Sequence, residues 1–216
     1  MKKGILFDLD GTLMDSLTDL HLCTNHILRQ YGCPERSVAE IRSFVGNGAA
    51  NLIRRALPGL ETDPDAGAVL ADYMTYYNDH CTENTGPYPG IPETLEALGK
   101  DYPMAVVSNK PHDAVVTLCR EHFGEGIYAL GTQPDCPRKP APDMLRKAMA
   151  AIGVDRCIYV GDSEVDVLTA QNTGVPCLSV LWGFRDREEL EAAGAACFCE
   201  TTAQLEQKIR QLLDTL

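Results

Sequence analysis

Two aspartates, Asp8 and Asp10, stand two residues apart directly after the short apolar run 5–7. Where the backbone is nearly extended, side chains two residues apart lie on the same side, so these carboxylates share one space. Neighbouring carboxylates repel each other, and a hard cation with oxygen ligands relieves the repulsion. A carboxylate can also act as a nucleophile and form an acyl phosphate. The pair is therefore suited to phosphoryl transfer, in which one carboxylate can attack phosphorus and Asp10 is placed to donate and accept the proton.

Further polar side chains follow this first run, follow later apolar runs or lie in the loops after them. At these positions stand Thr12, Ser108, Asn109, Lys110, Lys139 and Asp162. If the runs are parallel strands, their carboxyl ends meet at one edge of the sheet, where ligands bind in folds of this kind. Asp162 would then supply a third oxygen donor to the metal, Lys139 would neutralise phosphate charge, and Ser108 would hold phosphate oxygens. We predict Mg²⁺ rather than Ca²⁺, because magnesium keeps several waters whereas no loop here supplies the ligands that calcium needs.

The spacing of apolar residues predicts the elements that position these groups. Continuous apolar runs bounded by turn residues are typical of strands buried on both faces, and they occur at 4–7, 104–107, 127–130, 157–160, 177–181 and 195–199. Amphipathic segments predict helices at 92–99, 111–122, 142–152, 163–173 and 203–213. Strand and helix alternate, which indicates an α/β fold with a parallel sheet covered by helices on both faces.

One long segment interrupts this alternation. Between residues 15 and 88 the sequence predicts helices without strands, at 17–31, 38–45, 49–57 and 66–82. A stiff, turn-rich stretch, Gly86-Pro87-Tyr88-Pro89-Gly90, marks the return to the alternating pattern. We therefore predict a helical insert at 15–88 and a core formed by 1–14 and 89–216.

Four motifs occur in order along the chain: Asp8-Leu9-Asp10-Gly11-Thr12-Leu13, Ser108-Asn109-Lys110-Pro111, Lys139-Pro140-Ala141-Pro142-Asp143 and Gly161-Asp162-Ser163-Glu164-Val165-Asp166. Together they resemble the motifs of the haloacid dehalogenase-like hydrolase superfamily, and the resemblance covers nearly the whole chain. It implies a Rossmann-like parallel sheet core with a helical cap domain inserted after the first strand. It also implies that Asp8 is the nucleophile, that Asp10 is the acid and base, and that Ser108 and Lys139 bind phosphate. Mg²⁺ would bind to Asp8, the Asp10 carbonyl and Asp162, while Asp166 would hold a metal-bound water or Lys139.

Residue choices within this family favour a phosphatase. Dehalogenases do not need the acid and base that Asp10 supplies. β-Phosphoglucomutases carry a histidine ten residues after the second aspartate, where this chain has Leu20 with His21 beside it. The segment Val45-Gly46-Asn47-Gly48-Ala49 resembles the substrate loop of phosphoglycolate phosphatases. Gly-Asn-Gly before a helix exposes amides at the positive end of the helix dipole, which suits a carboxylate.

These observations predict a phosphomonoester hydrolase like the phosphoglycolate phosphatases, acting on a small phosphorylated metabolite. The predicted substrate contacts are Thr12, Asn47, Gly48, Ser108, Asn109 and Lys110. Pyrophosphate, a sugar phosphate and a nucleotide monophosphate are alternative substrates, because they would use the same core. A noncatalytic regulatory protein on the same fold is the alternative from another class. Such a noncatalytic protein would be recognised by the loss of a catalytic or metal-binding group, and none is lost.

Composition limits the partners and the compartment. The formal net charge of −12 argues against nucleic acid as a partner, since nonspecific binding takes a basic face. No apolar run approaches the roughly 20 residues of a membrane helix, and the apolar stretch after Met1-Lys2-Lys3-Gly4 is too short for a signal peptide. We therefore expect a cytoplasmic protein, a monomer or homodimer, whose nine cysteines are free thiols.

Overall fold

The computed structural model describes residues 2–57 and 66–216, which form two compact units. One of them, here called the core unit, comprises Met1–Met14 and Pro87–Leu216; the other, the helical unit, comprises Asp15–Gly86. The sequence-based boundary after residue 88 lies slightly later, because the turn-rich stretch 86–90 reads as a single linker.

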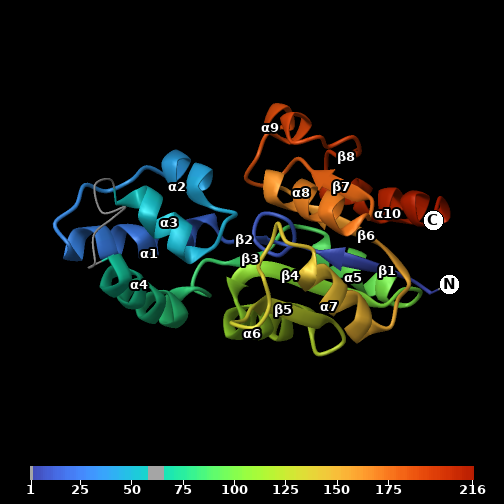
Figure 1. The fold of residues 1–216 in the computed structure, drawn as a ribbon, viewed down its shortest axis with the longest axis horizontal. Helices are drawn as coiled ribbons and strands as arrows, with labels where there is room; N and C mark the ends of the chain where they lie inside the picture. Colours follow the sequence, from blue (N-terminus) through green and yellow to red (C-terminus); the bar gives the residue numbers. More distant parts are fainter. Residues whose placement is uncertain (1, 58–65) are drawn as a thin grey trace. The chain divides into compact units, whose positions relative to one another are not determined.

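A six-stranded parallel sheet forms the middle layer of the core unit (Figure 1). Its strands, in the spatial order β5-β4-β1-β6-β7-β8, are β1 (Lys3–Phe7), β4 (Met104–Pro111), β5 (Tyr128–Thr132), β6 (Arg156–Gly161), β7 (Cys177–Val180) and β8 (Phe198–Cys199). From β1 the chain continues to β4 and β5 on one side and then returns to β6 on the other. The carboxyl ends of β4, β1 and β6 therefore meet where the strand order reverses, the usual place of a ligand site.

Helices cover both faces of this sheet. They are α5 (Ile91–Gly99), α6 (His112–Phe123), α7 (Asp143–Ile152), α8 (Glu164–Thr173), α9 (Arg187–Ala192) and α10 (Leu205–Asp214), the last preceded by the 3₁₀ turn η1 (Thr202–Gln204). Phe7 and Ile158 pack with α5, α6 and α10 in one apolar cluster, whereas Leu6 and Tyr159 pack with α7 and α8 in another. Because alternate residues of each strand enter opposite clusters, the strands read as continuous apolar runs. The layers confirm the predicted α/β class.

The helical unit contains α1 (Leu17–Gln30), α2 (Val38–Phe44), α3 (Ala49–Ala56) and α4 (Ala66–His80). These four helices lie where the sequence predicts them, and each ends one or two residues earlier. Ile27, Ile41 and Tyr73 are members of an apolar cluster that the helices bury within the unit. A capping box between Ser37 and Glu40 starts α2. The unit therefore has a core of its own.

Some short elements escape sequence prediction. Strand β2 (Met14–Asp15) pairs with β3 (Gly86–Pro87), where the chain passes from one unit to the other, and α9 spans only six residues. Elements of this length are too short to show a period in the sequence. Among the described residues, no helix is long and apolar enough to cross a membrane.

Candidate active site

Asp8 is the first residue after β1, and its side chain is buried. Its main-chain N–H donates to the carbonyl of Val160, in β6, at 2.8 Å. A tight turn follows, in which the amides of residues 12–14 all donate to the carbonyl of Leu9. Gly11 takes φ 84° within this turn, a left-handed conformation that glycine adopts without steric cost. The turn after Asp8 therefore depends on Gly11.

Lys139 is a buried lysine surrounded by acidic and phenolic oxygens. Its Nζ lies 2.8 Å from Asp8 Oδ1, 2.8 Å from Asp166 Oδ1 and 2.8 Å from the hydroxyl of Tyr159. Burial alone would lower the pKa of Lys139, but the carboxylates of Asp166 and Asp8 outweigh it and hold the pKa above its ordinary value. Lys139 is therefore a fixed positive charge beside Asp8.

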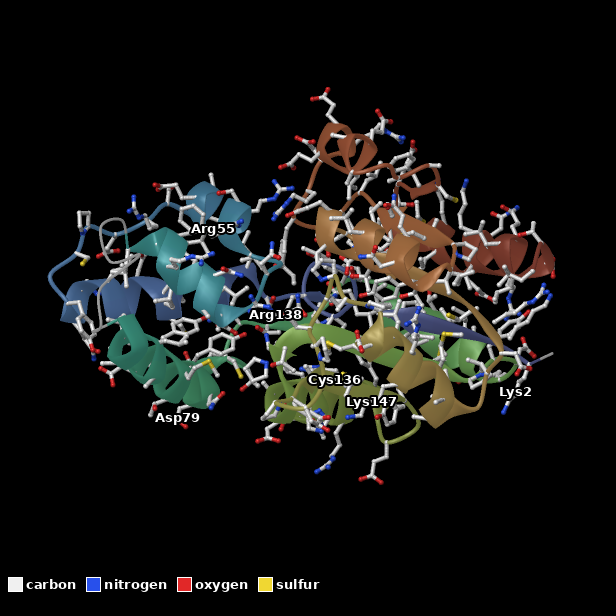
Figure 2. All side chains as sticks on the ribbon, viewed as in Figure 1. Lys2, Arg55, Asp79, Cys136, Arg138 and Lys147 are labelled. Carbon is white, nitrogen blue, oxygen red and sulfur yellow. The ribbon has the colours of Figure 1, made fainter. Side chains whose placement is uncertain are left out.

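The loop between β5 and α7 carries Lys139, and a side chain of β4 anchors it. Asn109 Oδ1 accepts a hydrogen bond from Lys139 N at 2.9 Å, and Asn109 Nδ2 donates to Lys139 O at 3.0 Å. The preceding residue of the loop, Arg138, is exposed and is labelled in Figure 2. The side-chain amide of Asn109 is thus used to hold this loop. The predicted contact between Asn109 and a substrate stays a prediction.

Asp166 lies in the first turn of α8 and is completely buried. Its Oδ1 accepts hydrogen bonds from Lys139 and from Tyr159, at 2.8 and 2.9 Å. Its Oδ2 accepts from the main-chain N–H and the hydroxyl of Ser163, at 3.1 and 2.6 Å. Burial would raise the pKa of Asp166, but Lys139 together with the hydrogen bonds from Ser163 and Tyr159 outweighs burial and lowers the pKa. With both oxygens occupied, Asp166 holds Lys139 and the start of the helix.

Asp162 directly follows β6 and is also buried. The hydroxyl of Thr12 donates to its Oδ1 at 3.0 Å, and the main-chain N–H of Phe184 donates to its Oδ2 at 2.7 Å. Burial, and then repulsion from Asp166, raises the pKa of Asp162 to about 7. Thr12, a predicted substrate contact, thus uses its hydroxyl to orient Asp162.

The carboxylates of Asp8, Asp162 and Asp166 offer oxygens within 4.8 Å of one another. Lys139 brings one positive charge to this group, and the charges remain unbalanced: burial, followed by repulsion from Asp166, raises the pKa of Asp8 well above its ordinary value. Among the residues that the structure describes, the buried Asp8 Oδ1 has the ion pair with Lys139 and no further donor. A hard divalent cation would balance these charges, so the residues present fit Mg²⁺. Asp8 and Asp162 would hold it, since Asp166 is occupied.

Asp10 forms an ion pair with Lys110, whose Nζ lies 2.9 Å from Asp10 Oδ1. The side chain of Lys110 is only 3% exposed, so this contact is well shielded from water. The sequence predicts that β4 ends at residue 107, but the strand continues through Lys110 with a register shift between Val107 and Pro111. Ser108 is buried, and its hydroxyl accepts a hydrogen bond from Lys110 N at 3.2 Å. Lys110 therefore contacts the predicted acid and base.

The predicted substrate loop belongs to the helical unit and leads into α3. Gly48, the N-cap residue, takes φ 79°. Because glycine has no side chain, it does not cap the first amides of the helix. The carbonyl of Asn47 accepts a hydrogen bond from the side chain of Asn51 at 2.8 Å. Arg55, which the sequence does not assign to the site, donates to two carbonyls at the end of α2 (Figure 2). Substrate contacts of Asn47 and Gly48 stay predictions.

Two residues that contact the charged groups of the site, Tyr159 and Phe184, are not identified from the sequence. The hydroxyl of Tyr159 touches both Lys139 and Asp166, but Tyr159 lies within an apolar run that predicts a strand. Phe184 offers its main-chain N–H to Asp162, a contact that no side-chain type reveals. Position is the available signal for Phe184, because the loop 181–185 follows β7 at the carboxyl edge of the sheet.

Known proteins with similar sequences are hydrolases of one family. A family model described as haloacid dehalogenase-like hydrolase matches residues 5–180. The phosphoglycolate phosphatase of Rhodobacter capsulatus is 36% identical over 192 residues, covering 86% of this chain and 87% of the relative. Phosphoglycolate phosphatase 1 of Pseudomonas aeruginosa is 36% identical over 195 residues, covering 85% of this chain and 71% of the relative.

A solved structure agrees over the whole fold. A protein of Lactobacillus delbrueckii subsp. bulgaricus, to which phosphoglycolate phosphatase activity is attributed, matches with a TM-score of 0.91 and 36% identity. The match covers 97% of this chain and 99% of that chain. Since the family model spans most of the sequence and the fold agrees with the relatives, the chain belongs to the haloacid dehalogenase-like hydrolase family.

Proposed function

We propose that this protein is a Mg²⁺-dependent phosphomonoester hydrolase that carries the phosphoryl group on Asp8. The observation that supports the proposal most strongly is the buried cluster in which Lys139 lies 2.8 Å from both Asp8 and Asp166. Phosphoryl transfer depends mainly on positioning and charge neutralisation. A buried carboxylate beside a rigid positive charge meets both needs.

In the first half of the proposed reaction, an oxygen of Asp8 attacks phosphorus while the bond from phosphorus to the leaving oxygen breaks. Lys139 neutralises charge on the nonbridging oxygens, and the hydroxyl of Ser108 binds one of them. Asp10, which must carry a proton at this stage rather than pair as a carboxylate with Lys110, donates that proton to the leaving oxygen, so the alcohol departs neutral. Mg²⁺, held by Asp8, Asp162 and the Asp10 carbonyl, would neutralise phosphate charge and orient the phosphoryl group.

In the second half, water attacks phosphorus and Asp10 accepts the proton that the water loses. The bond between phosphorus and the Asp8 oxygen breaks, inorganic phosphate leaves, and the carboxylate of Asp8 is restored. Throughout both halves, Asp166 and Asn109 keep Lys139 in place through the contacts described above. Each residue therefore ends the cycle in its starting protonation state.

For the substrate we propose 2-phosphoglycolate, a phosphate monoester with a carboxylate. Two observations support it: the relatives named above are phosphoglycolate phosphatases, and the Asn47-Gly48 loop leaves the start of α3 without a side-chain cap. The first amides of a helix attract anions, because they point outward at the positive end of the helix dipole. Asn47 would add a carboxamide donor to this anion site. A cytoplasmic location and a monomeric or homodimeric state remain predictions.

Phosphate release from a panel of phosphate esters and pyrophosphate, with Mg²⁺ present, tests this proposal. The panel contains 2-phosphoglycolate, pyrophosphate, a hexose phosphate and a nucleoside monophosphate. We expect 2-phosphoglycolate to give the highest kcat/KM. If it ranked far below another member, the substrate assignment would be wrong while the phosphatase mechanism stood.

Two matched variants test the covalent step in the same assay. Asp8→Asn removes the nucleophile with little change of volume, so we expect no more than a trace of turnover and an unchanged circular dichroism spectrum. Asp79→Asn makes the same chemical change on the exposed side of α4 (Figure 2) and should keep wild-type activity. Substantial turnover by Asp8→Asn would exclude the acyl phosphate mechanism. A folded wild-type protein without phosphatase activity would favour the noncatalytic alternative.

A further inference from the structure

The loop 181–185, between β7 and α9, converges on the carboxylate of Asp162, although its sequence carries none of the four motifs. Its start is tied to the sheet, where the N–H of Leu181 donates to the carbonyl of Cys199 at 3.0 Å. Its end is tied to α8, where Arg185 Nε donates to Glu164 Oε2 at 2.8 Å. The side chain of Arg185 is only 5% exposed. Both ends of the loop are therefore fixed to the core unit.

Within the loop, Gly183 lies against Asp162 with no room for a side chain. A Cβ added to Gly183 would lie 2.3 Å from Asp162 Cβ, 2.5 Å from Asp162 Oδ2 and 2.5 Å from the carbonyl oxygen of Gly11. Gly183 does not have a positive φ, so its backbone conformation is open to other residues. The need for glycine at this position is thus one of space, and the space is taken by Asp162.

The residues on either side of Gly183 complete the contact. The N–H of Phe184 donates to Asp162 Oδ2 at 2.7 Å. The indole Nε1 of Trp182 donates to the carbonyl of Thr12 at 3.0 Å, and the hydroxyl of Thr12 donates to Asp162 Oδ1. Asp162 is therefore held between two loops, and Trp182 joins them.

We propose that the loop 181–185 is a positioning element for the metal site, in which Gly183 and the Phe184 amide fix the carboxylate of Asp162 and Trp182 locks the loop onto Thr12. This inference rests on the proposed function, because it takes Asp162 as a Mg²⁺ ligand. Magnesium demands near-ideal octahedral geometry with short bonds, so a displaced ligand binds it poorly. A loop that served merely to connect β7 to α9 would not need to press its backbone against this carboxylate.

The substitution Gly183→Ala tests the proposal by pushing Asp162 out of position. The overlap involves a Cβ and a main-chain oxygen, which cannot swing away as the end of a long side chain can. We expect the Kd for Mg²⁺ to rise about 10- to 100-fold, the usual cost of losing a residue that orients a metal ligand. Gly126→Ala is the matched control: Gly126 is exposed, and an added Cβ would meet nothing within 4 Å. The control should bind Mg²⁺ as the wild type does.

The chain provides its own reporter for this titration. Trp182 is the single tryptophan and lies in the loop itself. Its fluorescence during addition of MgCl₂, checked by calorimetry, therefore measures metal binding independently of phosphatase activity. In activity assays, Gly183→Ala should need more Mg²⁺ for half-maximal rate while its KM for the phosphate ester at saturating Mg²⁺ stays close to that of the wild type.

The outcomes separate the two proposals. If the wild type binds Mg²⁺ and Gly183→Ala binds it equally well, the positioning role is wrong and the proposed function stands. If neither method detects Mg²⁺ binding by the wild type, both fail. Should Gly183→Ala not fold, Trp182→Phe serves instead, since it deletes the indole donor and keeps an aromatic ring. Calorimetry should then show Mg²⁺ affinity weakened about tenfold, and wild-type affinity in that variant would overturn the proposal.

Discussion

Asp19 in the helical unit and Asp8 in the core unit are both buried carboxylates, yet their surroundings differ. The two oxygens of Asp19 accept hydrogen bonds from the main-chain N–H and the side chain of Asn84 and of Thr85, at 2.7 to 3.0 Å. Asp8 Oδ1 instead has the ion pair with Lys139 at 2.8 Å, and no other described residue donates to it. Burial and repulsion from Asp166 raise the pKa of Asp8 well above its ordinary value.

The difference separates a structural carboxylate from a chemical one. Neutral donors fixed by the backbone satisfy Asp19, and its bonds to residues 84 and 85 tie the start of α1 to the end of the inserted segment. The carboxylates around Lys139 instead keep excess negative charge in a buried place, which is unfavourable unless a cation or a phosphoryl group compensates. Removing a partner should therefore affect stability alone in the helical unit, but stability and chemistry together in the core unit.

The largest effect is expected from Lys139→Met, which removes the positive charge between Asp8 and Asp166. Leaving a buried carboxylate without its partner should lower the free energy of unfolding by about 3 to 5 kcal/mol. Loss of the fixed charge should also lower kcat by at least about 100-fold, as loss of a preorganised donor does. Lys100→Met, at a side chain that is 70% exposed, is the control for both measurements. A Lys139→Met protein with near-wild-type kcat would show that Lys139 is structural, as Asp19 is.

A smaller and purely structural effect is expected from Asp19→Ala. The variant leaves the buried donors of Thr85, and the exposed Asn84 beside it, without an acceptor, which should cost about 3 kcal/mol. Urea unfolding followed by circular dichroism should show the loss, while the Mg²⁺ affinity measured through Trp182 stays unchanged. The control Asp79→Ala changes an exposed residue and should unfold at the same urea concentration as the wild type. If Asp19→Ala weakened Mg²⁺ binding as strongly as it weakened the fold, the contrast between the two carboxylates would not hold.

The two carboxylates also differ in how well the sequence reveals them. Asp8 and Asp162 each follow an apolar run, and the strands β1 and β6 bring those run ends to one sheet edge, as predicted. Asp19 sits in an ordinary amphipathic segment, and its partners Asn84 and Thr85 come more than 60 residues later. The residues around Asp19 in the sequence do not predict this pairing, because it depends on how the chain returns from the helical unit.

Main-chain contacts set a second limit on sequence prediction. Gly183 reads as a simple turn residue, and its closeness to Asp162 appears only when β6 and β7 lie side by side. Gly161 is similar, because a Cβ added there would lie 2.3 Å from Asp166 Cβ. Residue type and spacing thus predicted the charged groups of the candidate site, while the glycines and amides that hold them follow from the packing of neighbouring loops.

The smallest predicted effect is a pH dependence caused by Asp162 in the metal-free protein. Burial, and then Asp166, raises the pKa of Asp162 in the folded state from 3.8 to about 7, so the folded state keeps a proton that the unfolded state releases. Stability from this group is therefore present at low pH and is lost as the pH rises through 7. The loss between about pH 5.5 and about pH 7.5 should be near 2 kcal/mol. Urea unfolding in EDTA measures it.

Asp162→Asn isolates this contribution, because asparagine has no proton to lose over that range. The variant should therefore lose less stability than the wild type as the pH rises, whereas Asp79→Asn should follow the wild type. Added Mg²⁺ should offset the loss in the wild type, since the cation binds the ionised carboxylate and stabilises the folded state. If the free energy of unfolding fell equally steeply with pH in the wild type and in Asp162→Asn, the charge of Asp162 would be compensated within the protein, as that of Asp19 is. The site would then have no need of a cation.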